Sequence, residues 1–186
     1  MAKQTIGIGT TANDGTGDPL RDAFDKVNDN FDEVYSAFTF ASNNATVANN
    51  VLIGDSALGT ATTATENIAI GGDAMSLVAS GQAVTGVVAI GQNALKGGSS
   101  TTTGVNGSIA IGKDSLKVVT TGGTNVAVGF ETLKDNTTGG MNVGVGSAAA
   151  ENNTEGDENT VVGSYALHTN TTGNQNVAIG HDALRL

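Results

Sequence analysis

Only a few residues of this 186-residue chain have the types and spacing that catalysis requires. Ser56 stands in the segment Gly54-Asp55-Ser56-Ala57-Leu58, a short turn of the kind that can present a serine nucleophile. A serine nucleophile also needs a base, an acid and oxyanion donors nearby, and none of these can be named from the sequence. Similar G-x-x-[A/S/T]-[L/M/A] blocks recur along the chain, so this block is one copy of a repeated column. We predict that the protein is not an enzyme.

Candidates for metal and cofactor chemistry are equally sparse. His168 and His181 are the two histidines of the sequence, and we expect both to be solvated. Asp14 and Asp18 flank a glycine-rich turn as in calcium loops, but the ladder of ligands at alternating positions is missing. A polysaccharide hydrolase would need paired carboxylates in adjacent segments, and the dense acidic group instead lies within one turn. That group is Glu151, Glu155, Asp157 and Glu158. We predict no metal and no other cofactor.

A five-residue phrase recurs along the chain and organises it. Four clear copies are NVAVG, NVGVG, NTVVG and NVAIG, which close at Gly129, Gly146, Gly163 and Gly180. The step between these glycines is 17 residues. Weaker copies close at Gly54, Gly71, Gly91 and Gly112, so the steps from Gly54 onward are 17, 20, 21, 17, 17, 17 and 17.

The alternation within each phrase indicates a short strand. In the last copy we expect Val177 and Ile179 to point into the coil and Ala178 to point away. A 17-residue unit is too small to bury its apolar side chains alone, so neighbouring copies must cover them. The sequence therefore predicts a mostly β fold, a parallel β-solenoid or β-roll of about eight 17-residue coils over residues 50–186.

Three further expectations concern the details of the solenoid. The asparagine of each phrase should stack into a ladder that closes turns or bonds the neighbouring coil. A second glycine column, Gly122, Gly139, Gly156 and Gly173, is expected to supply positive φ angles in the turns. The two long steps place their extra residues in two loops, 80–86 and 97–107, which should leave the ladder intact.

A different kind of segment precedes the solenoid, because five of the seven aromatic residues fall in the first forty positions. Residues 1–17 read as an extended arm, and residues 41–49 read as a polar linker. Between them, residues 18–40 read as a helix that begins at the cap Asp18 and at Pro19. Apolar residues recur in this helix at steps of four and three, which is a heptad seam. The seam consists of Leu20, Phe24, Val27, Phe31, Val34 and Phe38.

This seam predicts self-association, although packing of the helix against its own solenoid is the alternative. Three phenylalanine layers would crowd a two-stranded core and suit a three-stranded one. We therefore predict a homotrimer joined by a helical bundle. Small solenoid residues should also allow neighbouring shafts to approach closely, and these are Ala69, Ala89, Ala110 and Ala127.

The charge and composition exclude several partners. The formal net charge is −10 and the eight lysines and arginines do not cluster, which argues against binding of nucleic acid. The sequence has no run of about twenty apolar residues, so we expect no membrane insertion. It also has no cysteine, which excludes disulfides.

The opening residues resemble the amino-terminal segment of many bacteriophage structural and tail-fibre proteins. The shared pattern is I-x-x-G-T-x-x-N-D-G-T-G-D-x-L-R-x-A-F-x-K-V-N-x-N-F, and in this chain it runs from Ile6 to Phe31. The resemblance implies that this segment attaches the protein to other proteins of a phage virion, in the tail or another appendage. The attachment residues that it implies are Ile6, Ile8, Asn13, Asp14, Gly15, Gly17, Asp18 and Arg21.

The repeats are similar to phage fibre repeats and to the β-roll head of trimeric autotransporter adhesins. Together the two resemblances imply a trimeric structural fibre whose amino terminus is fixed to the particle while the repeat shaft projects. The alternative is an adhesin module that binds host-surface glycans through its two loops, 80–86 and 97–107.

Overall fold

Short parallel strands connected by stacked turns make up the part of the chain that the structure describes. In this computed structural model the described residues are 40–41, 49–59, 61, 63–98 and 102–185, together with Val27. Apart from Val27, which is in a helical conformation, all of them belong to the unit Phe40–Leu186. Of the predicted arm, helix and linker, the structure describes Val27, Phe40, Ala41 and Asn49, and the other residues lie outside the described ranges.

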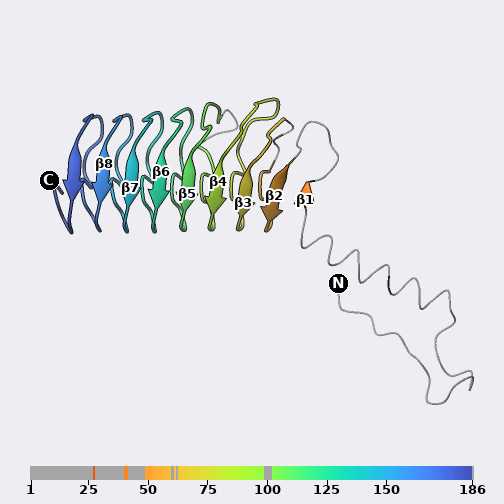
Figure 1. Ribbon diagram of the computed structural model, residues 1–186, viewed down its shortest axis with the longest axis horizontal. Helices are drawn as coiled ribbons and strands as arrows, with labels where there is room; N and C mark the ends of the chain where they lie inside the picture. The colour runs from red at the N-terminus through yellow and green to blue at the C-terminus, as the bar shows by residue number, and fades with distance from the viewer. Residues whose placement is uncertain are drawn as a thin grey trace, which may run out of the picture. The chain divides into compact units, whose positions relative to one another are not determined.

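The strands follow one another in a single sheet, in the same order as in the sequence (Figure 1). From β2 to β9 all neighbours pair in parallel, and each strand is followed by one turn of the coil before the next. The predicted parallel β-solenoid is thus confirmed, with about seven turns between its eight parallel strands. These are β2 (Asn50–Ile53), β3 (Ile68–Ile70), β4 (Val88–Ile90), β5 (Ile109–Ile111), β6 (Val126–Val128), β7 (Val143–Val145), β8 (Thr160–Val162) and β9 (Val177–Ile179).

A short strand precedes the solenoid and pairs with its first strand. This strand, β1 (Phe40–Ala41), runs antiparallel to β2, with Phe40 opposite Val51. The sequence placed residue 40 at the end of the predicted helix, and the structure places it in β1. The pairing supplies hydrogen-bond partners to an edge of β2 that would otherwise be open.

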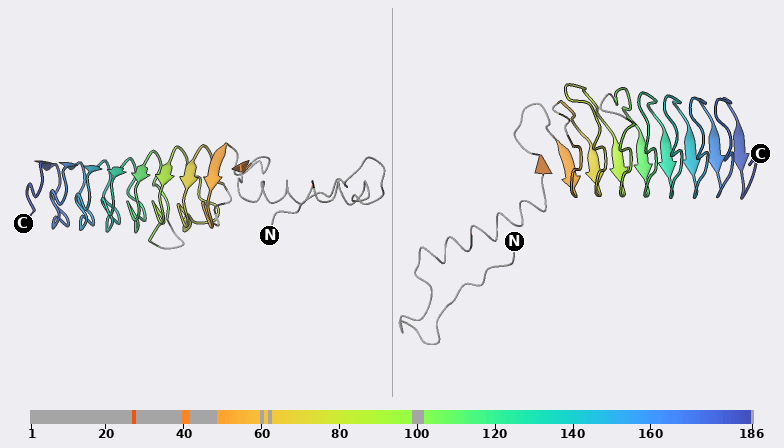
Figure 2. Two further views of the ribbon diagram at one scale, coloured as in Figure 1. Left: turned by 90° about the horizontal axis from the view of Figure 1, so that it is seen from below. Right: turned by 180° about the vertical axis from the view of Figure 1, so that it is seen from behind.

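Each coil is hydrogen-bonded to its neighbours around its whole perimeter. In the strand, the backbone N–H of Val126 donates to the carbonyl oxygen of Asn142 over 2.8 Å. In the turn segments, Leu133 N–H donates to the carbonyl of Ala149 over 3.0 Å. Figure 2 shows the result, with strands along one side of the rod and stacked turn segments along the other.

The two loops leave this ladder intact, as predicted. Strands β3, β4 and β5 stay in register across both long steps, with Ala69 opposite Ala89 and Ala89 opposite Ala110. Isolated bridges join Thr65 to Thr85 and Val78 to Thr102, so residues near the loops also pair with neighbouring coils.

The strand side chains point opposite to the prediction. In β9, Ala178 is 1% exposed, whereas Val177 and Ile179 are 65% and 68% exposed. The same holds along the sheet, where the central alanines Ala69, Ala89, Ala110 and Ala127 are fully buried. The predicted role of this alanine column in contacts between shafts was therefore wrong, because these residues lie inside the coil.

The interior leaves little room for side chains from the strands. It is already filled from the turn segments by the buried side chains of Met75, Leu95, Leu116, Leu133 and Leu167. At Gly144, the central residue of β7, an added Cβ would lie 2.7 Å from Thr132 Cγ2 and 3.4 Å from Leu133 Cδ1. The centre of the strand therefore holds alanine or glycine in most coils, with Leu52 in β2 and Val161 in β8 as the larger exceptions, and the flanking valines and isoleucines face outward.

Left-handed backbone conformations accompany the leucines whose side chains fill the interior of the coil. Leu133 has a φ of 49°, and Leu95, Leu116 and Leu167 have φ values of 46°, 47° and 48°. Such a conformation costs a non-glycine residue on the order of 1–3 kcal/mol. Burial of a leucine side chain stabilises the folded state by about the same free energy, so burial offsets the cost of these turn conformations.

Asparagine side chains form the predicted ladder inside the coil. The backbone N–H of Asn142 donates to Asn125 Oδ1 over 2.8 Å, and that of Asn159 donates to Asn142 Oδ1 over 2.9 Å. The side-chain amide of Asn142 also donates to the carbonyl of Gly156 over 2.8 Å. These buried amides therefore join one coil to the next and close the turns.

The second glycine column is needed for a different reason from the predicted one. Gly122, Gly139, Gly156 and Gly173 are not among the residues with positive φ. A Cβ added at Gly139 would instead collide with the carbonyl oxygen of Gly156 and with Asn136 Oδ1. Close approach of the neighbouring coil, and not the φ angle, requires glycine here.

This packing predicts that Gly139→Ala destabilises the solenoid by about 1–3 kcal/mol, because the neighbouring coil must shift to admit a methyl group. The measurement is the free energy of unfolding in urea. Gly72→Ala is the matched control, since Gly72 has no atom within 4 Å of its added Cβ and no positive φ. Equal destabilisation by the two changes would contradict the packing explanation.

Candidate interaction surface

The serine candidate has no histidine in its own or the next coil of the described residues. Ser56 is exposed in a turn that recurs in every coil, and its φ of 56° is close to the 59° of Asp73, which holds the same position one coil further on. His168 lies six coils away, which is about 29 Å at the strand spacing. The stack therefore holds His168 far from Ser56.

The two histidines differ in their surroundings. His181 is exposed, as predicted, with Nδ1 3.0 Å from Asp182 Oδ2. His168 was also predicted to be solvated, but it is half-buried, and its Nε2 lies 3.1 Å from Glu151 Oε2. Among the described residues no group of three or more histidines and carboxylates is placed to hold a metal ion.

The acidic turn is engaged with neighbouring coils. Asp157 Oδ1 accepts a hydrogen bond from the backbone N–H of Gly140 over 2.7 Å. Glu158 Oε2 accepts one from the side-chain amide of Gln175 over 3.0 Å. These carboxylates therefore support the stack and do not form a facing catalytic pair.

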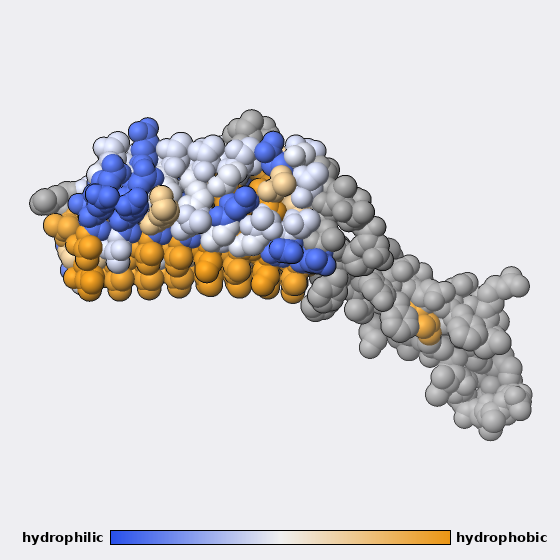
Figure 3. Space-filling model, turned by 45° about the horizontal axis from the view of Figure 1, so that its top comes forward, coloured by the Kyte–Doolittle hydropathy of each residue, from blue (hydrophilic) through white to orange (hydrophobic). Residues whose placement is uncertain are grey.

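The most distinctive surface of the solenoid is its outward strand side, which we call the strand face. Figure 3 shows it as a continuous hydrophobic band along the rod. All but one of its sixteen side chains are valine or isoleucine, and none carries a charge. The strand face comprises Val51, Ile53, Ile68, Ile70, Val88, Ile90, Ile109, Ile111, Val126, Val128, Val143, Val145, Thr160, Val162, Val177 and Ile179.

Two large apolar side chains border the strand face on opposite edges. Met141 precedes Asn142 and β7, so it lies where strands begin, and it is 57% exposed. Phe130 follows Gly129 after the end of β6, so it lies where strands end, and it is 48% exposed. Neither residue was predicted from the sequence to have a function.

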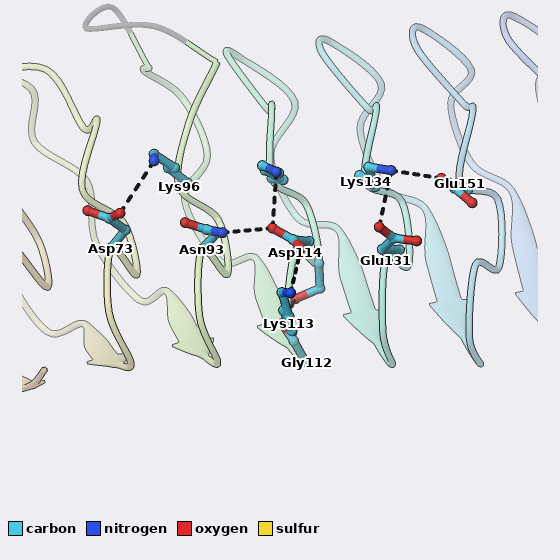
Figure 4. A network of polar contacts seen from close by, with 11 residues as sticks. Asp73, Asn93, Lys96, Gly112, Lys113, Asp114, Glu131, Lys134 and Glu151 are labelled. Atoms are coloured by element: carbon cyan, nitrogen blue, oxygen red, sulfur yellow. Dashed lines mark hydrogen bonds and ion pairs between the residues drawn. The ribbon is translucent and has the colours of Figure 1, made fainter.

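Charged side chains gather on the turn segments and link one coil to the next (Figure 4). Lys134 Nζ bridges Glu131 of its own coil at 3.2 Å and Glu151 of the next coil at 3.0 Å. Lys96 Nζ lies 3.4 Å from Asp73 of the preceding coil. These pairs align successive coils, whereas the strand face has no charge at all.

Two charged groups of the turn segments, Asp114 and Lys134, have shifted pKa values. Burial by itself raises the pKa of Asp114, but hydrogen bonds from Asn93 (2.8 Å) and Lys117 (3.1 Å) and the charges of Lys117 and Lys113 outweigh it, so this pKa is lowered. The hydrogen bond to Glu151 raises the pKa of Lys134 well above its usual range, and Glu131 adds to that effect. Both groups are held in their charged forms.

The predicted trimer and attachment residues lie outside the described residues, apart from Val27, which is helical and half-buried. The described part of the chain has no helix with the length and hydrophobicity needed to cross a membrane.

Comparison with known families gives one match. A family model described as "Bacteriophage T4 gp9/10-like protein, N-terminal" matches residues 3–123, which is 121 of the 186 residues. The matched range begins in the predicted arm and ends in the turn before β6. Comparisons with curated proteins and with solved structures give no match. The similarity to adhesin β-rolls stays a prediction from the repeats.

The lowered pKa of Asp114 predicts a pH-dependent contribution to stability. A carboxylate with a lowered folded pKa stabilises the fold above its unfolded pKa of about 4 and loses this effect as the pH falls through the folded value. Asp114→Asn should therefore lower the free energy of unfolding at about pH 7 and make little difference at about pH 2. Asparagine tolerates the φ of 59° at this position.

Urea unfolding of the wild type and the variant at the two pH values measures this difference. Asp55→Asn is the control, because Asp55 is exposed on the first coil. A difference for Asp114→Asn that is the same at both pH values would contradict the ion-pair origin of the effect.

Proposed function

The chain belongs to the bacteriophage T4 gp9/10-like N-terminal family, and from this membership we propose that it is a trimeric structural fibre whose amino-terminal segment binds the virion. Membership makes it a structural component of a phage particle. In the proposal, the solenoid is a shaft that projects from the attachment point.

The observation that carries the proposal is the extent of the family match. It begins at residue 3 and continues through the predicted helix into the solenoid, as far as residue 123. The predicted attachment segment and the first coils of the shaft thus lie within one family match. This continuity supports a single appendage in which attachment and projection belong together.

The construction of the solenoid supports a spacer role. Eight parallel strands at about 4.8 Å per step give a rod about 38 Å long. Hydrogen bonds around the whole perimeter and buried asparagine ladders fix each coil to the next. A projecting shaft needs this stiffness and needs no catalytic group.

The assembly that we propose is a homotrimer joined by the heptad seam of residues 18–40. Phe24, Phe31 and Phe38 form its aromatic layers in this proposal, with Leu20, Val27 and Val34 between them. In this proposal the attachment residues lie in the segment from Ile6 to Arg21, which carries the resemblance to phage structural proteins. Binding to a host glycan is a different function, and a glycan array probed with the full chain would detect it.

The proposal predicts a native mass of three copies of the 18.4 kDa chain, measured by sedimentation equilibrium. It also predicts that Phe31→Asp lowers incorporation into phage particles, because a charge in the seam opposes bundle formation. Ser36→Asp is the matched control, since it adds the same charge to the same predicted helix outside the seam.

Incorporation is measured by complementing a phage that lacks this gene and probing purified particles for the protein. A monomeric or dimeric wild-type mass would reject the trimer. Incorporation of the Phe31→Asp chain at the wild-type level would reject the role of the seam in attachment.

A further inference from the structure

We infer that the strand face is an interface between copies of this chain, in which neighbouring shafts lie side by side and point in the same direction. In this arrangement, the edge of one shaft that carries Phe130 meets the edge of the next that carries Met141. The inference rests on the trimeric fibre proposed above and assigns it a second interface, separate from the helical seam.

The first argument is the size and chemistry of the strand face. Its outward side chains cover about 38 Å along the rod and about 10 Å across the strands, or roughly 400 Å². Monomeric proteins rarely leave a larger contiguous apolar patch in water. The absence of charge on this face contrasts with the ion pairs of the turn segments, which keep that side soluble.

The second argument is the repeat distance, which identifies the occupant. The two rows of branched side chains repeat once per coil, at about 4.8 Å. A partner that packs into them along eight coils must present side chains at the same spacing. A second copy of this chain does so, because its strands have the same spacing when the shafts are parallel.

The third argument is the position of Phe130 and Met141. They are large, apolar and exposed, and they lie on opposite edges of the strand face, one coil apart. A rotationally symmetric assembly of parallel shafts brings opposite edges together. Both side chains are long enough to meet across an offset of one coil, and their contact would bury two of the most exposed apolar groups of the shaft.

The area of the surface agrees with a stable contact once both edges are included. The seven residues from the Met141 column to the Phe130 column span about 23 Å, which gives about 900 Å² along the shaft. A standard protein interface buries about 800 Å² per partner. The strand face alone is too small for this, so the edges have to take part.

The sequence provides a clean test, because it contains no cysteine. The full chain carrying Phe130→Cys and Met141→Cys is treated with a short bis-maleimide and separated on a denaturing gel. We expect covalent trimers from this double variant and only monomers from either single variant, since like edges do not meet. Native mass is measured in parallel for all three chains.

The crosslinking pattern and the native mass together test the parallel arrangement of shafts. Covalent dimers from a single variant would overturn the inference, because they require like edges to meet. A native trimer without crosslinks in the double variant would also overturn it and would leave the proposed trimeric fibre standing. A monomeric native mass would reject the fibre proposal and this inference together.

A substitution in the strand face separates docking from folding. Val145→Lys, added to the double-cysteine chain, should lower the yield of covalent trimer about tenfold or more, because it places a charge in an apolar contact. Circular dichroism should stay unchanged, since Val145 points out of the coil. Glu155→Lys is the control, as it changes the charge of an exposed turn away from the strand face. A crosslink yield that Val145→Lys leaves unchanged would overturn the inference.

Discussion

The spacing of backbone hydrogen bonds between coils is the constraint from which the rest of this structure follows. Each coil must bring its N–H and carbonyl groups into line with those of the coils before and after it, around the whole perimeter. This requirement leaves no room for a Cβ at Gly139, where the next carbonyl is too close. It also places each ladder asparagine directly beside the next, so that one side-chain oxygen can accept from the following backbone N–H.

A 17-residue coil encloses a narrow interior, and the side chains that fill this interior determine which strand residues face outward. Leu133 and its equivalents fill the interior from the turn side, so most strands contribute only alanine or glycine at the centre, with Val161 and Leu52 as the larger exceptions. The branched residues on either side are then directed outward. A protein that gains strand stability from valine and isoleucine thus acquires an apolar face, and this face is the direct result of a small cross-section.

The sequence was enough to predict the period, the strands and the parallel ladder. It was also enough to predict that the two loops leave this ladder intact. An alternating strand pattern, however, gives two faces without saying which one is inside. The signal was present in the central column, where four successive strands carry alanine (Ala69, Ala89, Ala110 and Ala127), as expected of an enclosed position. Phe130 and Met141 could not be identified in advance, because their importance depends on which face is outside. The pairing of His168 with Glu151 depends on two residues 17 positions apart being stacked, and it follows only from the exact register.

The stacked coils also hold a long stretch of polypeptide within a short distance along the shaft. A coil of 17 residues advances the shaft by about 4.8 Å, while the same residues pulled straight would reach about 58 Å. Tension applied between the two ends of the solenoid would therefore lengthen it in large discrete steps, one coil at a time from an end, because each coil contacts only its neighbours. A shaft built this way can yield under a sudden load without breaking its covalent connection, and it can recover its length when the released coil winds back onto the stack.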